Sequence, residues 1–173
     1  MLPSLERMLS LKLLIWAFPV VFLIHDGEEI LTVERFLQAH SNLIARFGIP
    51  AGITSTQFAS AAALIFVLVA VVTLRAASNP RSPAYTRLFT FGVVILLVNS
   101  ITHLGQTCII GAYTPGVVTA GLITLPYSLY TLRRLFLAKL IDRRTLMKMA
   151  GAGLVVFVIL VAAAQGLVRV LFN

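Results

Sequence analysis

The sequence predicts an all-α membrane protein: one domain, residues 1–173, built as a polytopic bundle of about five transmembrane helices. Two observations support this prediction. First, 59% of the 173 residues are hydrophobic and only 12% are charged, too few charges to solvate a globule of this size. Second, the mean hydropathy is +0.97, and the apolar residues gather in runs that approach the length of a bilayer crossing. A water-soluble protein with a large apolar core is therefore excluded.

The first two expected spans cover residues 11–31 and 58–74. Between them lies a loop, 32–57, that mixes polar and apolar residues. Within this loop, apolar residues recur at helical spacing over 33–47, which predicts a short helix lying in the membrane interface. The second span ends before the motif SNPRSP, whose prolines predict a turn.

The remaining three spans are expected at 88–110, 115–132 and 150–170. A short turn, GAYT, separates the third span from the fourth. The basic loop RRLFLAKLIDRRTLMK separates the fourth from the fifth, and we expect it to contact the anionic headgroups of membrane lipids.

The basic residues indicate the orientation of the bundle. With five spans, the N-terminus and the loops at 75–87 and 133–148 share one side of the membrane. That side carries eleven of the fourteen lysines and arginines: Arg7, Lys12, Arg75, Arg81, Arg87, Arg133, Arg134, Lys139, Arg143, Arg144 and Lys148. The other three are Arg35, Arg46 and Arg169. By the positive-inside rule, the chain is a multi-pass protein of the cytoplasmic membrane with its N-terminus in the cytoplasm. Because this asymmetry accounts for the net charge of +8, no nucleic-acid partner is expected.

The first span contains an unusual cluster of ionisable residues, HDGEE, with three of the chain's six acids and one of its three histidines. The uninterrupted apolar run before it, 13–24, gives only about 18 Å of helix, whereas a bilayer core is about 30 Å thick. We therefore expect the span to include HDGEE, toward the outer leaflet. The alternative is a short re-entrant or interfacial segment, which would upset the distribution of basic residues. Each such residue costs on the order of 2–3 kcal/mol at that depth, so these side chains must face polar partners.

The spacing of this motif places His25, Glu28 and Glu29 on one face of a helix, in the i, i+3, i+4 relation. The third span carries a matching stripe, because Asn99 and His103 are four residues apart and Gln106 follows three residues later. These two faces are expected to meet.

Depth supports the same pairing. Counted from Lys12 and Arg87 at 1.5 Å per residue, His25 and His103 both lie about 20–24 Å above the inner boundary. Gln165, on the fifth span, reaches the same level. We therefore predict a polar cavity in the outer half of the bundle, lined by the histidines and glutamates, with these supporting residues: Asn99, Gln106 and Gln165.

The motif His25-x-x-Glu28-Glu29 in a first membrane helix, with Asn99-x-x-x-His103 further on, resembles the HXXEE family of bacterial membrane proteins, which is named for it. The resemblance covers most of the chain, because family members are about this long. It implies a location in the bacterial inner membrane. The family has no firmly established activity, so the resemblance implies no mechanism.

Imidazoles and carboxylates together are the ligands of zinc and of non-haem iron. His25 and Glu29 can bind one divalent ion from a single helix turn, and His103 can complete three protein ligands. Glu28 is then free to act as a general base, so the candidate catalytic residues are Glu28, Glu29 and His103. Asn99 or Gln106 can orient a ligand or stabilise an oxyanion. The preferred function is a metal-dependent, hydrolase-like enzyme acting on a lipid or membrane-embedded substrate.

Three other interpretations stay open. Without a metal, Glu28 or Glu29 can protonate a lipid while His25 or His103 accepts a proton, as an isomerase or cyclase requires. The same groups suit a proton- or cation-coupled transporter, in which a homodimer can supply the symmetry that one chain lacks. In a purely structural interpretation, the polar residues form a hydrogen-bond network that fixes helix packing.

Overall fold

The computed structural model describes residues 4–42, 54–79 and 82–172; within these ranges, nothing is described of the side chains of 4–10, 161, 164, 165 and 167–172. The helices are α1 (Ser4–Ala39), α3 (Ser55–Ser78), α4 (Pro83–Ile110), α5 (Val117–Thr119), the π-helix η1 (Ala120–Thr124), α6 (Leu125–Leu137) and α7 (Arg143–Phe172). The described residues form no strand. The all-α prediction is confirmed.

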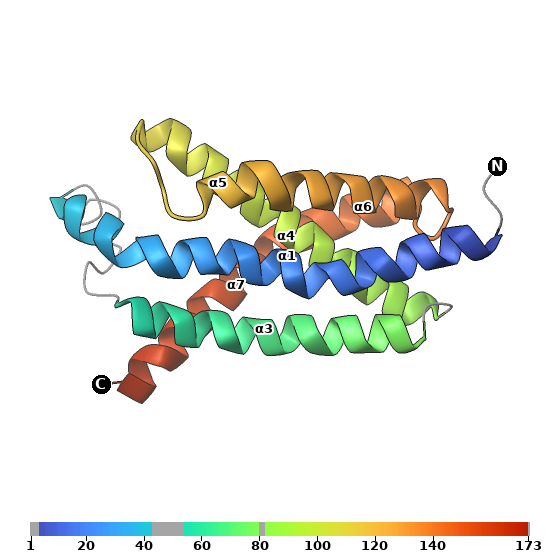
Figure 1. Ribbon diagram of the computed structural model, residues 1–173, viewed down its shortest axis with the longest axis horizontal. Helices are drawn as coiled ribbons and strands as arrows, with labels where there is room; N and C mark the ends of the chain where they lie inside the picture. Colours follow the sequence, from blue (N-terminus) through green and yellow to red (C-terminus); the bar gives the residue numbers. More distant parts are fainter. Residues whose placement is uncertain (1–3, 43–53, 80–81, 173) are drawn as a thin grey trace.

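The chain reverses direction between α1 and α3, between α3 and α4, between α4 and α5, and between α6 and α7, as Figure 1 shows, whereas α5, η1 and α6 continue in one direction. Helices α1, α3 and α5 to α6 lie roughly parallel in this view, while α4 and α7 cross them diagonally. The start of α1, the turn from α3 to α4 and the turn from α6 to α7 share one end of the molecule. We call it the basic end, because the segments that meet there contain these cations: Lys12, Arg75, Arg87, Arg133, Arg134, Lys139, Arg143, Arg144 and Lys148.

Local signals explain where several helices begin and end. α3 starts with a capping box, in which Thr54 Oγ1 accepts from the Gln57 N–H and Gln57 Oε1 accepts from the Thr54 N–H. α4 begins with Pro83, whose missing N–H is harmless at that position, and ends at Gly111 in the left-handed conformation.

The first helix is longer than the expected span. α1 continues through HDGEE and then from Thr32 to Ala39, where the sequence predicted a loop. The extension is helical because Val33 and Leu37 are buried together with Phe36 and Phe58, which lies on α3. The predicted interfacial helix at 33–47 is helical over 33–39, as expected, but this part continues α1 and is not a separate helix; residues 43–53 lie outside the described residues.

The fourth expected span, 115–132, falls on three consecutive pieces of helix: α5, η1 and α6. The Leu125 N–H donates to the Ala120 carbonyl, five residues earlier, instead of four. This π-turn lies just before Pro126, which has no N–H and whose ring would clash with the carbonyl four residues back. The proline thus explains why the regular α-helical ladder is interrupted here.

Two described helices, α3 and α4, are long and apolar enough to cross a membrane. That all five expected spans do so stays a prediction.

The core sets the spacing of the helices that carry the polar residues. Phe18 of α1 packs edge-on against Phe89 of α4, with ring centroids 5.7 Å apart, and stacks on Tyr127 of α6 at 6.5 Å. A Cβ at Gly92 would lie 3.1 Å from Phe18 Cζ, so the Phe18 ring of α1 packs against α4 where residue 92 has no side chain. Further from the basic end, α5 and η1 pack against both α1 and α4.

Candidate functional site

The site lies where α1 and α4 face α5, the first part of the helical segment formed by α5, η1 and α6. Gly111 and Gly116 both adopt left-handed backbone conformations, with φ of 69° and 82°. The chain can therefore leave α4, turn back and present the first residues of α5 to α1. Figure 1 shows α5 above α1, at the end of the molecule remote from the basic end.

Three ionisable side chains, His25, Glu29 and His103, form what we call the His/Glu cluster. His103 Nε2 lies 2.8 Å from Glu29 Oε1, and His25 Nε2 lies 4.0 Å from the same oxygen. The two imidazole rings are edge to face, 4.9 Å between centroids. One ligand atom from each residue lies within 4.8 Å of the other two, so the group can hold a metal ion. His25 is fully buried, and the Glu29 side chain is 14% exposed.

Both ring nitrogens of His25 are engaged. Nδ1 lies 2.9 Å from Thr119 Oγ1, and Nε2 lies 2.8 Å from the side-chain nitrogen of Asn99. Because an amide nitrogen only donates, His25 Nε2 is the acceptor, and a neutral ring then carries its proton on Nδ1 and donates it to Thr119. The nitrogen that points toward the His/Glu cluster is therefore the one with a lone pair.

Glu28 faces α5 instead of the His/Glu cluster. Its Oε1 accepts hydrogen bonds from the Tyr113 hydroxyl at 2.7 Å and from the Val118 N–H at 3.2 Å. Its Oε2 accepts from the Thr119 N–H at 2.7 Å and from Thr119 Oγ1 at 2.6 Å. A carboxylate is favourable here because the first N–H groups of a helix have no partner within the helix. Through these hydrogen bonds Glu28 links α5 and the preceding turn to α1.

These contacts join into one chain. The Thr119 hydroxyl donates to Glu28 and accepts from His25, which in turn accepts from Asn99. The carboxylate therefore acts on the imidazole through a threonine, and fixes both the tautomer and the orientation of the ring.

Gly116 closes the site from the side of the turn. A Cβ at this position would lie 2.9 Å from His25 Cε1 and from Glu29 Cγ, and 3.1 Å from Glu29 Oε1. Its φ of 82° is also a conformation that favours glycine. The backbone of Gly116, which has no side chain, thus packs directly against the His/Glu cluster.

The structure brings together four of the residues singled out from the sequence: His25, Glu29, Asn99 and His103. Glu28 joins them only through Thr119. The Gln106 side chain is exposed and does not join this group, and the Gln165 side chain lies outside the described residues.

Sequence reasoning missed three residues of the site, Tyr113, Gly116 and Thr119. The available signal was a tyrosine, two glycines and a threonine within nine residues of the end of an apolar helix that carries a histidine.

His103 Nδ1 is buried and has no hydrogen-bond partner among the described residues, so His103, unlike His25, is oriented only through its other nitrogen.

A family model described as a protein of unknown function with HXXEE motif matches residues 16–131. The chain belongs to the HXXEE family. The match begins in α1, ends in α6 and includes every residue of the hydrogen-bonded site, so the family motif and the geometry coincide: its histidine is His25, and its two glutamates are Glu28 and Glu29. No match to a curated protein or to a solved structure was found.

Proposed function

We propose that this HXXEE-family protein is a multi-pass protein of the cytoplasmic membrane, with the basic end in the cytoplasm. Three features support the proposal: two helices of membrane-spanning length and hydropathy, cations gathered at one end, and large apolar side chains that are widely exposed. Leu31 is 81% exposed, Ile109 78% and Leu122 74%. A lipid environment would cover such side chains, which a water-soluble protein normally buries or keeps in small patches.

We also propose that the His/Glu cluster binds a divalent transition metal, zinc or iron. With metal–ligand distances of about 2.0 Å, tetrahedral ligands are about 3.3 Å apart. The distances of Glu29 Oε1 from His103 Nε2 and His25 Nε2, 2.8 and 4.0 Å, lie on either side of that value. Side-chain rotations that bring both distances to this value would allow an ion to bind. The single observation that carries the proposal is this set of three ligand atoms within 4.8 Å, drawn from two helices and largely buried.

The surrounding contacts suit a metal ligand. Histidines that bind metals normally donate their second ring N–H to a fixed acceptor, and His25 does so to Thr119, which Glu28 holds. Asn99 donates to the same Nε2 that would bind the ion. On metal binding its amide must move away, which leaves it free to hold an oxygen of a substrate.

The proposed reaction is a hydrolase-like, metal-dependent step on a lipid or another membrane-embedded substrate near the outer leaflet. A bound divalent ion would supply a Lewis acid and an activated water. His25, Glu29 and His103 would hold the ion, and Glu29 and His103 would lie next to the reacting atoms. Glu28 is a positioning residue in this proposal and not the general base expected from the sequence, because all four of its hydrogen bonds are directed to residues 113–119.

One observation favours a second candidate. His103 Nε2 contacts Glu29 Oε1 directly, at 2.8 Å, which places an imidazole and a carboxylate within hydrogen-bonding distance. Such a pair suits metal-free acid–base chemistry on a lipid, or a proton- or cation-coupled transporter.

Elemental analysis of the purified protein separates these candidates. We expect about one zinc or iron per chain, lost in both His25→Ala and His103→Ala. The matched control is His40→Ala, because in the described part of the chain the third histidine bonds to the Phe36 carbonyl near the end of α1 and not to the His/Glu cluster, so its loss should not affect the metal. A protein that stays metal-free after incubation with zinc and with iron would contradict the metal proposal and support the second candidate.

A further inference from the structure

The turn from α4 to α5, residues 111–116, lies against the His/Glu cluster. In Figure 1 the chain leaves the end of α4 and dips toward α1 before α5 begins. The Gly116 backbone packs against His25 and Glu29. Beside it the cluster is nearly closed: His25 is 0% exposed, His103 7% and the Glu29 side chain 14%. A substrate therefore needs part of this cover to move before it can reach the three side chains.

Two different attachments hold the turn. Toward α4, the buried Thr114 hydroxyl pairs with the Thr107 hydroxyl and donates to the His103 carbonyl at 3.5 Å. Toward α1, the Tyr113 hydroxyl donates to Glu28 Oε1 at 2.7 Å, and we call this hydrogen bond the latch. The first attachment joins neighbouring parts of the chain, whereas the latch joins residues 85 positions apart. The turn can therefore stay with α4 while its contact with α1 opens.

Tyr113 is the part of the turn that is best placed to move. Its side chain is 43% exposed, whereas Thr114 is 1% exposed. Gly111 and Gly116 flank the turn, both with positive φ, and a Cβ at Gly111 would meet nothing within 4 Å. A half-exposed residue that follows an unhindered glycine can swing away at little more cost than its one hydrogen bond.

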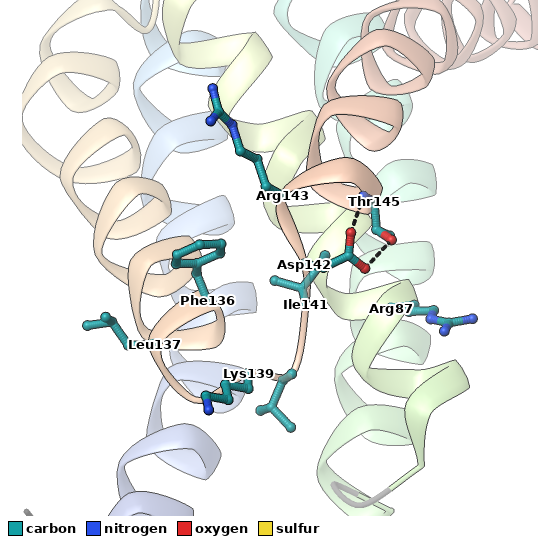
Figure 2. A pocket seen from close by; sticks show the side chains of 9 residues that line it. Arg87, Phe136, Leu137, Lys139, Ile141, Asp142, Arg143 and Thr145 are labelled. Carbon is teal, nitrogen blue, oxygen red and sulfur yellow. Dashed lines mark hydrogen bonds between the residues drawn. The ribbon is translucent and has the colours of Figure 1, made fainter.

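The turn between α6 and α7, at the basic end, is built differently. Figure 2 shows its acid, Asp142, hydrogen-bonded to the N–H of Thr145 at 2.8 Å and to the Thr145 hydroxyl at 2.7 Å, three residues later. The cations that line the pocket beside this turn point away from one another and do not meet at one ligand: Arg87, Lys139 and Arg143. The bonds of Asp142 fix the shape of a single turn, whereas the latch joins two elements.

We propose that residues 111–116 form a gate over the His/Glu cluster, held shut by the latch, and that ligands enter between this turn and α1 from the outer side of the membrane. Opening breaks the latch and lifts Gly116 from His25 and Glu29, and closing restores both contacts. The gate itself rests on the geometry of the turn. That it admits a metal ion and a lipid-like substrate rests on the proposed function.

Acylation of histidines by diethyl pyrocarbonate tests the gate in the metal-free full chain. The reagent needs access to a ring nitrogen, so His25 and His103 react only while the site is open. Tyr113→Phe keeps the aromatic ring and removes the latch. Because the loss of a hydrogen bond to a carboxylate favours the open form, acylation of both histidines should become about tenfold faster. His40, which bonds to the Phe36 carbonyl outside the cluster, should keep its rate. Mass spectrometry of peptides reads each histidine separately.

The matched control is Tyr130→Phe, which removes the hydroxyl of a tyrosine of similar exposure, 48%, on α6. It should behave as the wild type. With zinc, Tyr113→Phe should bind and release the ion faster by the same factor at unchanged Kd, because the latch is closed in both the free and the loaded protein. Faster release alone, with a weaker Kd, would mean that Tyr113 supports the ligands and is not part of a gate.

Three further results would overturn the inference: unchanged acylation of His25 and His103 in Tyr113→Phe, an equal rise at His40, or the same rise in Tyr130→Phe. Failure of the metal proposal would look different, because the protein would then bind no zinc while acylation still depended on the latch.

Discussion

Glu28 and Glu29 are adjacent in sequence and identical in chemistry, yet they face different partners. Glu29 contacts His103 and lies near His25, whereas Glu28 accepts four hydrogen bonds from Tyr113, Val118 and Thr119. At the scale of single residues, the motif therefore combines a histidine and a glutamate that would bind the proposed metal with a second glutamate that positions the histidine.

Glutamine at each of the two positions should separate these roles. Glu28→Gln should lower the free energy of unfolding by about 2 kcal/mol, because an amide nitrogen cannot accept from Thr119. Glu29→Gln should keep the fold, since its amide oxygen can still accept from His103, but should lose the metal. Chemical unfolding and metal content of both variants check this. Loss of metal in Glu28→Gln alone would reverse the assignment.

Thr119 connects Glu28 to His25 through its hydroxyl. Thr119→Val keeps the shape of the side chain but removes the hydroxyl, so we expect about 10- to 100-fold weaker metal binding. Thr119→Ser keeps the hydroxyl and should restore most of the affinity. Competition with a chromophoric chelator measures both variants. Equal affinities of the valine and serine variants would show that the threonine only fills space.

At the scale of elements, the turn from α4 to α5 completes the site. Gly116→Ala should impair metal binding, because its Cβ would lie 2.9 Å from atoms of His25 and Glu29. Gly111→Ala is the control: its φ is also positive, but nothing lies within 4 Å of its Cβ, so it should cost only the backbone strain, about 1 kcal/mol. Chelator competition and unfolding should show that only the first variant loses metal. Similar affinities would contradict the close approach.

The same scale shows why part of the site could be predicted. Helical periodicity alone aligns His25 with Glu29, and Asn99 with His103, and equal depth in two apolar spans pairs these faces. The role of α5 could not be predicted, because its contacts with Glu28 join residues about ninety positions apart and depend on the path of a short turn. The extension of α1 was missed because Val33 and Leu37 become buried only when α3 packs beside them.

At the scale of the whole molecule, the proposed topology places Cys108, the chain's single cysteine, near the outer end of α4. Its side chain is exposed. A membrane-impermeant maleimide should therefore label it in spheroplasts without lysis. In Cys108→Ala with Ala138→Cys the thiol moves to the basic end, and labelling should then require lysis. The reverse pattern would show that the basic end faces outward.

If His25, Glu29 and His103 bind one metal ion, as we propose, cobalt(II) titration of the metal-free protein should show it. Cobalt replaces zinc in such sites, and its visible absorption reports a low-coordinate set of nitrogen and oxygen ligands. The wild type should develop this absorption and saturate at one equivalent, while His25→Ala and His103→Ala should not and His40→Ala should. No absorption in the wild type, or the same absorption in all four proteins, would contradict the claim.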